Sequence, residues 1–141
     1  MNRYLVIVVS LALVSGCKQN MTEPLQSLIV DTDKSSYAPN ETVAISLHNG
    51  STLTAYFGHC DYRIGFCIEQ KVNGSWSEKG SIALVCLAIY PVGVKAITPG
   101  TIITDWITIA DSGIYRLKYP FGWRQSEMSA HSLLSNEFSV R

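Results

Sequence analysis

The feature that most restricts the fold of this chain is an alternation of apolar and polar residues that begins near Ser27. In residues 42–48, Val43, Ile45 and Leu47 alternate with polar or small residues. A period of two places successive side chains on opposite faces of a β-strand, so this segment predicts a strand with one buried face. Residues that favour turns recur roughly every eight to twelve positions, which predicts an all-β fold of the sandwich type.

Turn residues mark the ends of the other predicted strands. Asn73-Gly74 lies between two strand-like runs, and it is a strong hairpin signal because both residues accept positive φ at little cost. Pro99-Gly100 and Asp111-Ser-Gly113 are further turn formers. Strands are therefore predicted at residues 42–48, 53–59, 66–72, 101–109, 114–119 and 136–140.

The beginning of the chain predicts an export signal. Residues 4–14 form an uncharged apolar run behind Arg3. Such a run is too short to cross a bilayer as a helix, which needs about 20 residues, and it is typical of a signal-peptide core. We therefore divide the chain into a signal peptide at 1–16, a polar tether at 17–26 and one domain at 27–141.

The apolar run ends in Val14-Ser-Gly-Cys17, which resembles the lipobox of bacterial lipoproteins. The resemblance implies cleavage before Cys17 and attachment of acyl chains such as palmitate, which would anchor the protein to membrane lipid. A secretory signal peptide with an incidental cysteine is the alternative. In such lipoproteins an Asp after the cysteine favours the inner membrane. Lys18 therefore implies a cell-envelope location, at the outer membrane facing the periplasm if the cell has one.

Charge argues against nucleic acid as a partner. The chain has 11 basic and 11 acidic residues, and Arg3 is the only charged residue in the predicted signal peptide. The mature domain therefore stays nearly neutral and has no cluster of Lys and Arg. Phosphate backbones are bound by basic faces, so we expect no nucleic-acid partner.

Residues 111–117 carry a second resemblance. Asp111, Gly113 and Tyr115 are similar to the D-x-G-x-Y-x-C stretch of immunoglobulin domains, which implies a tyrosine corner with the Tyr115 hydroxyl bonded to nearby backbone. Leu117 replaces the disulfide cysteine, so aliphatic packing is expected there. The order of turn and aromatic residues over 29–141 is also similar to bacterial immunoglobulin-like modules, including the intracellular proteinase inhibitor group. The resemblance implies an antiparallel immunoglobulin-like β-sandwich, with a jelly roll as the alternative.

Three cysteines remain once Cys17 is lipidated. Exported proteins meet an oxidising compartment, so two of the three are expected to pair. We prefer a Cys60–Cys86 disulfide that leaves Cys67 free, although the other pairings stay open. The preference assumes that strand 66–72 turns one face to the core, with Phe66, Ile68 and Val72, and one to solvent, with Cys67, Glu69 and Lys71.

No motif for catalysis or metal binding is present in the sequence. His59 adjoins Cys60 and Cys67 lies nearby, but the close ligand pairs typical of metal sites, such as C-x₂-C, are missing. There is no G-x-S-x-G, H-E-x-x-H or glycine-rich phosphate loop. We therefore expect no cofactor, no metal and no enzyme activity, with a triad assembled in space as the alternative.

The remaining candidate for function is a surface. Residues 119–134 predict a long connection before the last strand, and loops at the end of a sandwich often bind partners. The alternative is that this segment folds back over the core; a second candidate is the apolar segment 88–94. Interface energies are dominated by Trp, Tyr and Arg, and the predicted binding loop carries Tyr119, Phe121, Trp123 and Arg124.

These features together indicate a membrane-anchored lipoprotein that acts as a non-catalytic binding module. The expected partner is a protein. The alternative is a proteinase inhibitor of the bacterial immunoglobulin-like type, because the resembled group includes inhibitors and a projecting loop could occupy a protease cleft.

Overall fold

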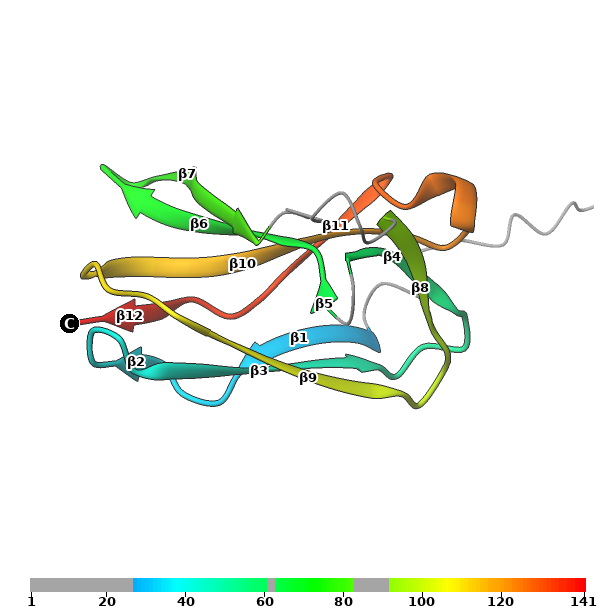
Figure 1. Ribbon diagram of the computed structural model, residues 1–141, viewed down its shortest axis with the longest axis horizontal. Coiled ribbons are helices and arrows are strands. Elements are labelled where there is room, and N and C mark those ends of the chain that lie inside the picture. The colour runs from blue at the N-terminus through cyan, green and yellow to red at the C-terminus, as the bar shows by residue number, and fades with distance from the viewer. Residues whose placement is uncertain (1–26, 61–62, 83–91) are drawn as a thin grey trace, which may run out of the picture.

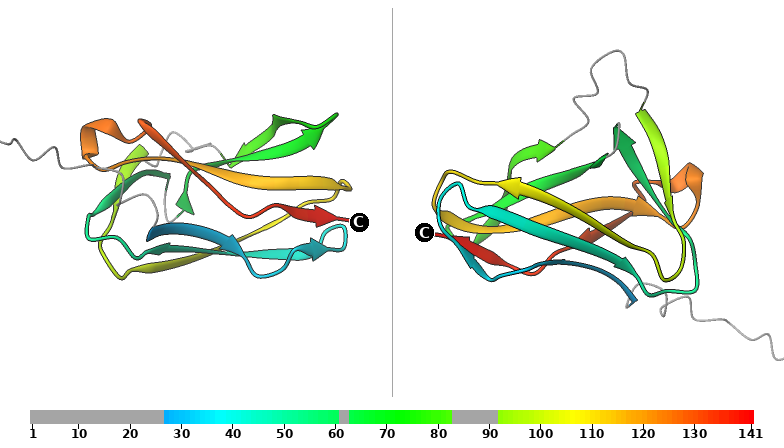
Figure 2. Two further views of the ribbon diagram at one scale, coloured as in Figure 1. Left: turned by 180° about the vertical axis from the view of Figure 1, so that it is seen from behind. Right: turned by 60° about the horizontal axis from the view of Figure 1, so that its bottom comes forward.

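The computed structural model describes residues 27–60, 63–82 and 92–141, which form two facing layers of β-strands (Figure 1). Figure 2 shows the same two layers from behind and from below. One short 3₁₀ helix, η2 (Gln125–Glu127), lies among the described residues. The strands are β1 (Leu28–Thr32), β2 (Ser36–Tyr37), β3 (Thr42–Asn49), β4 (Ala55–Cys60), β5 (Arg63–Ile64), β6 (Phe66–Val72), β7 (Ser75–Ile82), β8 (Val92–Ile97), β9 (Ile102–Thr108), β10 (Gly113–Gly122), β11 (His131–Leu134) and β12 (Phe138–Val140).

The smaller sheet has the strand order β1-β3-β9, with both pairs antiparallel. Its central strand β3 alternates as the sequence predicts. Val43, Ile45 and Leu47 are buried, whereas Thr42 and Ser46 on the other face are exposed. Strand β9 lies at the edge of this sheet in the part of the chain that the structure describes.

The larger sheet is organised around β10, the longest strand. It pairs antiparallel with β12, β6, β11 and β4, and β2 joins β12 in parallel. The chain therefore leaves the smaller sheet after β1, adds β2 to the larger sheet, and returns to the smaller sheet for β3. Together with the facing strands β9 and β6, this topology is an immunoglobulin-like β-sandwich, as the sequence predicts. The β4–β8 pair and β5 extend one end of the larger sheet.

Aromatic side chains fill the space between the sheets. Tyr37 meets Phe138 edge-on at 5.6 Å between ring centroids, and Phe57 stacks on Phe121 at 5.7 Å. Each such pair adds about 0.5–1.5 kcal/mol beyond the area that it buries. The core is therefore held by aromatic contacts between strands that lie far apart in the sequence.

Tyr115 has the geometry of a tyrosine corner. The ring is fully buried, and the hydroxyl donates a hydrogen bond to the carbonyl oxygen of Asp111 at 2.9 Å. Gly113 does not have positive φ. A Cβ on Gly113 would lie 2.5 Å from the end of the flexible Gln70 side chain, which can move aside, and 3.1 Å from the Tyr115 ring, so the buried ring leaves little room for a larger residue.

The predicted hairpin at Asn73-Gly74 is confirmed. Both residues have positive φ, 50° and 80°, and the flanking residues Val72 and Ser75 pair across the turn. Two central residues with positive φ match a type I′ turn, whose twist suits an antiparallel hairpin.

The predicted faces of β6 agree with its pairing to β10, because Glu69 lies opposite Arg116 and Cys67 lies opposite Lys118, on the side away from the buried Tyr115 and Leu117. The predicted exposures are wrong: Glu69 is only 9% exposed, whereas Val72, at the end of the strand, is 47% exposed. The bulge opposite Ile68 and Glu69 places its extra residue, Lys79, in β7 and leaves the alternation of β6 unchanged. The buried carboxylate is compensated by Arg116, whose Nε lies 2.6 Å from Glu69 Oε2.

The predicted loop at 119–134 is also wrong in its first part. Strand β10 continues through Gly122, and Tyr119 and Phe121 are core residues with exposed fractions of 2% and 0%. Pro120 lies within this strand, opposite Ser132 of β11. Trp123 packs against the Phe121 ring at 5.3 Å.

Other predictions lie outside the described residues. These are the signal peptide at 1–16, the tether at 17–26 with Cys17, and most of the apolar segment 88–94. Cys86 is also outside, so its pairing with Cys60 stays a prediction. Cys67 is a free, half-buried cysteine.

Candidate binding cleft between the two sheets

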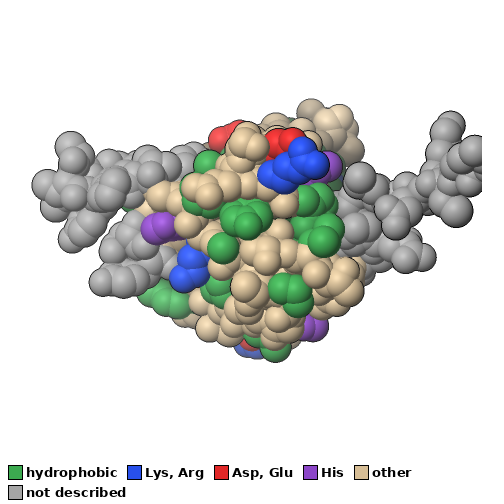
Figure 3. Space-filling model, turned by 90° about the vertical axis from the view of Figure 1, so that its right-hand side faces the viewer, with side chains coloured by type: hydrophobic (Ala, Val, Ile, Leu, Met, Phe, Trp, Pro, Cys, Tyr) green, Lys and Arg blue, Asp and Glu red, His purple; other side chains and the backbone are tan. Residues whose placement is uncertain are grey.

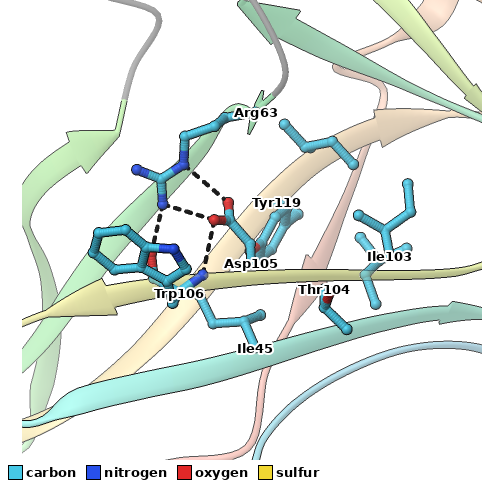
Figure 4. Close-up of a pocket in the computed structure, with 9 residues that line it drawn as sticks. Ile45, Arg63, Ile103, Thr104, Asp105, Trp106 and Tyr119 are labelled. Carbon is cyan, nitrogen blue, oxygen red and sulfur yellow. Dashed lines mark hydrogen bonds and ion pairs between the residues drawn. The ribbon is translucent and has the colours of Figure 1, made fainter.

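A cleft of about 280 Å³ opens between the sheets beside the edge strand β9. Strands β3 and β9 form one wall, and β5 and β10 form the other (Figure 4). Ligand sites in proteins are concave, mostly apolar and equipped with a few polar groups, and their volumes begin at about 300 Å³. The lining residues are Ile45, Leu47, Arg63, Ile64, Ile103, Thr104, Asp105, Trp106 and Tyr119.

The walls are aliphatic because the strand pairing puts apolar positions side by side. Leu47 of β3 lies opposite Ile103 of β9, and Ile45 lies opposite Asp105. Ile45, Leu47 and Ile64 are buried core residues, and Ile103 packs against the same core. The cleft is thus an open continuation of the hydrophobic core.

The mouth of the cleft is closed on one side by an ion pair that joins the two sheets. Arg63 Nε and Nη2 donate to the two carboxylate oxygens of Asp105 at 3.1 and 2.9 Å. Arg63 Nη2 also donates to the carbonyl oxygen of Trp106 at 2.6 Å, and the guanidinium lies 5.7 Å from the centroid of the indole (Figure 4). The side chains of Arg63 and Asp105 are 40% and 20% exposed, so the pair contributes at most about 1 kcal/mol to stability. Its main effect is to fix the position of both side chains.

Tyr119 supplies the polar group inside the cleft. Burial raises the pKa of its phenol, the charge of Asp105 raises it further, and Arg63 lowers it. The hydroxyl forms no hydrogen bond to any residue that the structure describes, and none of the fully buried side-chain polar atoms there lacks a partner. The Tyr119 oxygen is therefore not sealed in the core but reaches the space of the cleft, protonated at neutral pH.

The end of the sandwich that holds η2 and the β4–β8 pair looks different. Figure 3 shows apolar side chains spread over this end and separated by polar atoms, without one continuous apolar patch. Arg124 is exposed there and forms an ion pair of 3.7 Å with Glu127. This surface therefore offers less to a partner than the cleft does.

Of the residues singled out from sequence, only Tyr119 lines the cleft. Asp111, Gly113 and Tyr115 form a structural corner. Sequence reasoning missed Arg63, Asp105 and Trp106. One signal was present: Asp105 occupies an inward position between Ile103 and Ile107, where an unpaired charge would be costly.

The described residues hold neither a cluster of metal ligands nor a membrane-spanning helix. Among residues 27–60, 63–82 and 92–141, no group of three or more His, Cys, Asp and Glu side chains is placed to hold a metal ion. In the same ranges no helix has the length and apolar character needed to cross a bilayer.

Comparison with known proteins adds information about the fold alone. No family model matches the chain, and no curated protein matches it. The alkylpurine DNA glycosylase AlkC of Pseudomonas fluorescens aligns at 11% identity and a TM-score of 0.45, over 82% of this chain and 30% of that one. The sporulation control protein Spo0M of Bacillus subtilis aligns at 11% identity and a TM-score of 0.45, over 82% of this chain and 49% of that one. This chain therefore spans less than half of either protein.

A third similar structure is the ASH / PapD-like domain of human CEP192. It is 17% identical with a TM-score of 0.35, and the alignment covers 94% of this chain and 96% of that domain. At such values none of these similarities carries an inference about function. The chain has an immunoglobulin-like β-sandwich fold, and the case for its function depends on its own residues.

Proposed function

We propose that this chain is an exported, lipid-anchored binding module that captures a protein partner at the cleft between β9, β5 and β10. The anchor is Cys17, as its resemblance to the lipobox implies. Residues 18–26 would span at most about 30 Å when extended, which is enough to hold the domain clear of lipid head groups. The oxidising compartment outside the inner membrane would favour the Cys60–Cys86 disulfide.

The observation that carries the proposal is the group of side chains at the mouth of the cleft. Trp106 is 59% exposed on the edge strand, and Arg63 is held beside it by Asp105. Trp and Arg are enriched among residues that dominate interface energies, especially next to a pocket that a partner can fill. Here the cleft adjoins both side chains. The hydrogen bonds of Arg63 to Asp105 and to the Trp106 carbonyl oxygen fix their positions in the absence of a partner.

The chemistry of the cleft supports binding rather than catalysis. Both carboxylate oxygens of Asp105 accept hydrogen bonds from Arg63, and one also accepts from the Trp106 N–H at 2.8 Å. The residues that line the cleft include no serine, cysteine, histidine or lysine. Thr104 and Tyr119 supply the hydroxyl groups of the lining, and the Asp105 carboxylate that could act as their base is already bonded to Arg63.

The proteinase-inhibitor alternative is not favoured by any observation. It relied on a loop that projects at Tyr119 and Phe121, and both residues are buried in the core. Of the four residues of the predicted binding loop, Arg124 is the exposed one, and its charge is already paired with Glu127.

Site-specific photocrosslinking in intact cells tests the proposal. A photoreactive phenylalanine at position 106 is compared with one at Ile114, which is 44% exposed on the outer face of the other sheet. We expect one protein partner to crosslink from position 106 and not from 114, and Ile103→Trp, which fills the cleft, to abolish the product. Equal crosslinking from both positions, or a product that persists in Ile103→Trp, would contradict the proposal.

A further inference from the structure

We infer that the cleft receives a single tyrosine side chain of the protein partner, with its phenol beside the Tyr119 hydroxyl. This inference rests on the proposed function and specifies which group of the partner enters. It follows from the size of the cleft, the apolar nature of its walls, the balance of charge at its mouth and the polar group inside it.

Size restricts the occupant to one large side chain. A dry cavity of about 150 Å³ holds benzene, which has six non-hydrogen atoms. By that scale, a cleft of about 280 Å³ holds roughly ten non-hydrogen atoms. That is enough for one aromatic side chain but too little for a second one.

Charge excludes ionised side chains. Arg63 and Asp105 already neutralise each other at the mouth, and the other lining residues, which are isoleucines, a leucine, Thr104, Trp106 and Tyr119, carry no charge at neutral pH. A Lys, Arg, Asp or Glu of the partner would lose its hydration without gaining a free counter-charge, which is costly. The occupant is therefore uncharged.

The Tyr119 hydroxyl selects among uncharged side chains. It is a donor that has no partner among the described residues and that touches solvent in the empty cleft. A Leu, Ile or Phe side chain would displace that solvent and leave the hydroxyl unpaired, whereas a tyrosine has an apolar ring with a polar tip. The partner phenol oxygen accepts from the Tyr119 hydroxyl, while the ring of the partner lies against the isoleucine and leucine side chains of the walls.

The test uses two peptides that differ by one oxygen, acetyl-Gly-Tyr-Gly-amide and acetyl-Gly-Phe-Gly-amide. Each is titrated into the full chain, and the isoleucine methyl signals are followed by NMR. Ile64 and Ile103 report on the cleft, while Ile29 and Ile114 lie outside its lining and serve as controls. We expect the Tyr peptide to shift the cleft signals and to bind about fivefold more tightly than the Phe peptide, the factor that one hydrogen bond supplies.

The variant Tyr119→Phe should remove this preference, so that both peptides bind with equal affinity. The variant keeps the ring and removes a hydroxyl that supports no contact within the described structure, so folding should survive. As a second variant, Ile103→Trp should abolish binding of both peptides. Equal affinities in the unchanged protein, a preference that persists in Tyr119→Phe, or shifts confined to the control signals would overturn the inference.

The two proposals fail in different ways. A partner that crosslinks from position 106 while both peptides leave the cleft signals unchanged would overturn the tyrosine inference and leave the binding cleft standing. Tyr-selective binding without any crosslinked partner would contradict the proposed capture of a protein instead.

Discussion

Replacement of Tyr115 separates the contribution of a buried ring from that of its hydroxyl. The ring is fully buried and stacks on Phe138 with a centroid distance of 6.0 Å. Tyr115→Ala removes these contacts and leaves a cavity, so we expect a loss of about 3–5 kcal/mol in the free energy of unfolding. That is a large share of the 5–15 kcal/mol, approximately, that stabilises a typical domain.

Tyr115→Phe keeps the ring and removes one hydrogen bond of 2.9 Å to the Asp111 carbonyl. The Asp111 side chain is 65% exposed, which places this corner near solvent. Water can therefore reach the carbonyl, and the penalty for a buried unpaired acceptor does not apply. We expect a cost of about 1 kcal/mol, the usual net value of a hydrogen bond.

Urea unfolding of the full chain, followed by circular dichroism, measures both variants against Ile114→Thr. Ile114 is the exposed neighbour of Tyr115, and its replacement should change the free energy of unfolding by less than about 0.5 kcal/mol. A Tyr115→Ala variant as stable as this control would show that the ring does not support the core. Equal costs for Tyr115→Phe and Tyr115→Ala would show that the hydroxyl, not packing, carries the stabilisation.

Three further predictions concern the turn, the cleft and the cysteines. Gly74→Ala should lower the free energy of unfolding by about 1–2 kcal/mol, because residue 74 has a φ of 80°. The control Gly80→Ala should be close to neutral, because residue 80 lies in open space and does not have positive φ. A larger loss of unfolding free energy in Gly80→Ala than in Gly74→Ala would contradict this. Because the pKa of Tyr119 is raised by burial, the neutral phenol is favoured in the folded state, and stability should fall as pH rises above about 10. Tyr119→Phe should make that fall shallower, and an unchanged slope in alkaline urea titrations would refute the linkage. Alkylation of the denatured, unreduced protein from its own compartment should label one cysteine, Cys67, while labelling of every cysteine in the domain would exclude a disulfide.

The parts of the fold that were predictable from sequence depend on local chemistry. Strand β3 follows from the alternation of Val43, Ile45 and Leu47, and the hairpin follows from Asn73-Gly74, because each pattern determines its own backbone geometry. The immunoglobulin-like topology follows from a motif resemblance around Tyr115. In each case the residues that carry the signal belong to the strand or turn that they predict, or lie next to it in sequence.

The errors came from features that alternation does not report. Glu69 lies on the outer face of β6 as alternation predicts, but it is buried there, and the cost of burying it is offset by Arg116, which is 47 residues away in sequence. Strand β10 passes through Pro120, where pairing with Ser132 of β11 keeps the chain in the sheet. In both cases a neighbouring strand supplies what the local sequence lacks.

The candidate site was mostly beyond the reach of sequence. Arg63 and Asp105 are separated by 42 residues and belong to different sheets, so no local spacing pairs them. Strand β5, which places Arg63, has only two residues. Tyr119 was selected as an exposed binding residue, and its place in the cleft is instead a consequence of its burial in β10.

The most direct test of the proposed role is the identity of the N-terminus of the protein recovered from cells, because lipid anchoring determines which partners the cleft can meet. Mass spectrometry of the N-terminal peptide, compared between the unchanged protein and Cys17→Ser, makes this measurement. We expect a peptide that begins at Cys17 and carries a diacylglyceryl group with acyl chains, and we expect Cys17→Ser to lack both the lipid and the membrane association. An unmodified Cys17, or a mature protein that begins at another residue and does not sediment with membranes, would contradict the proposed anchoring.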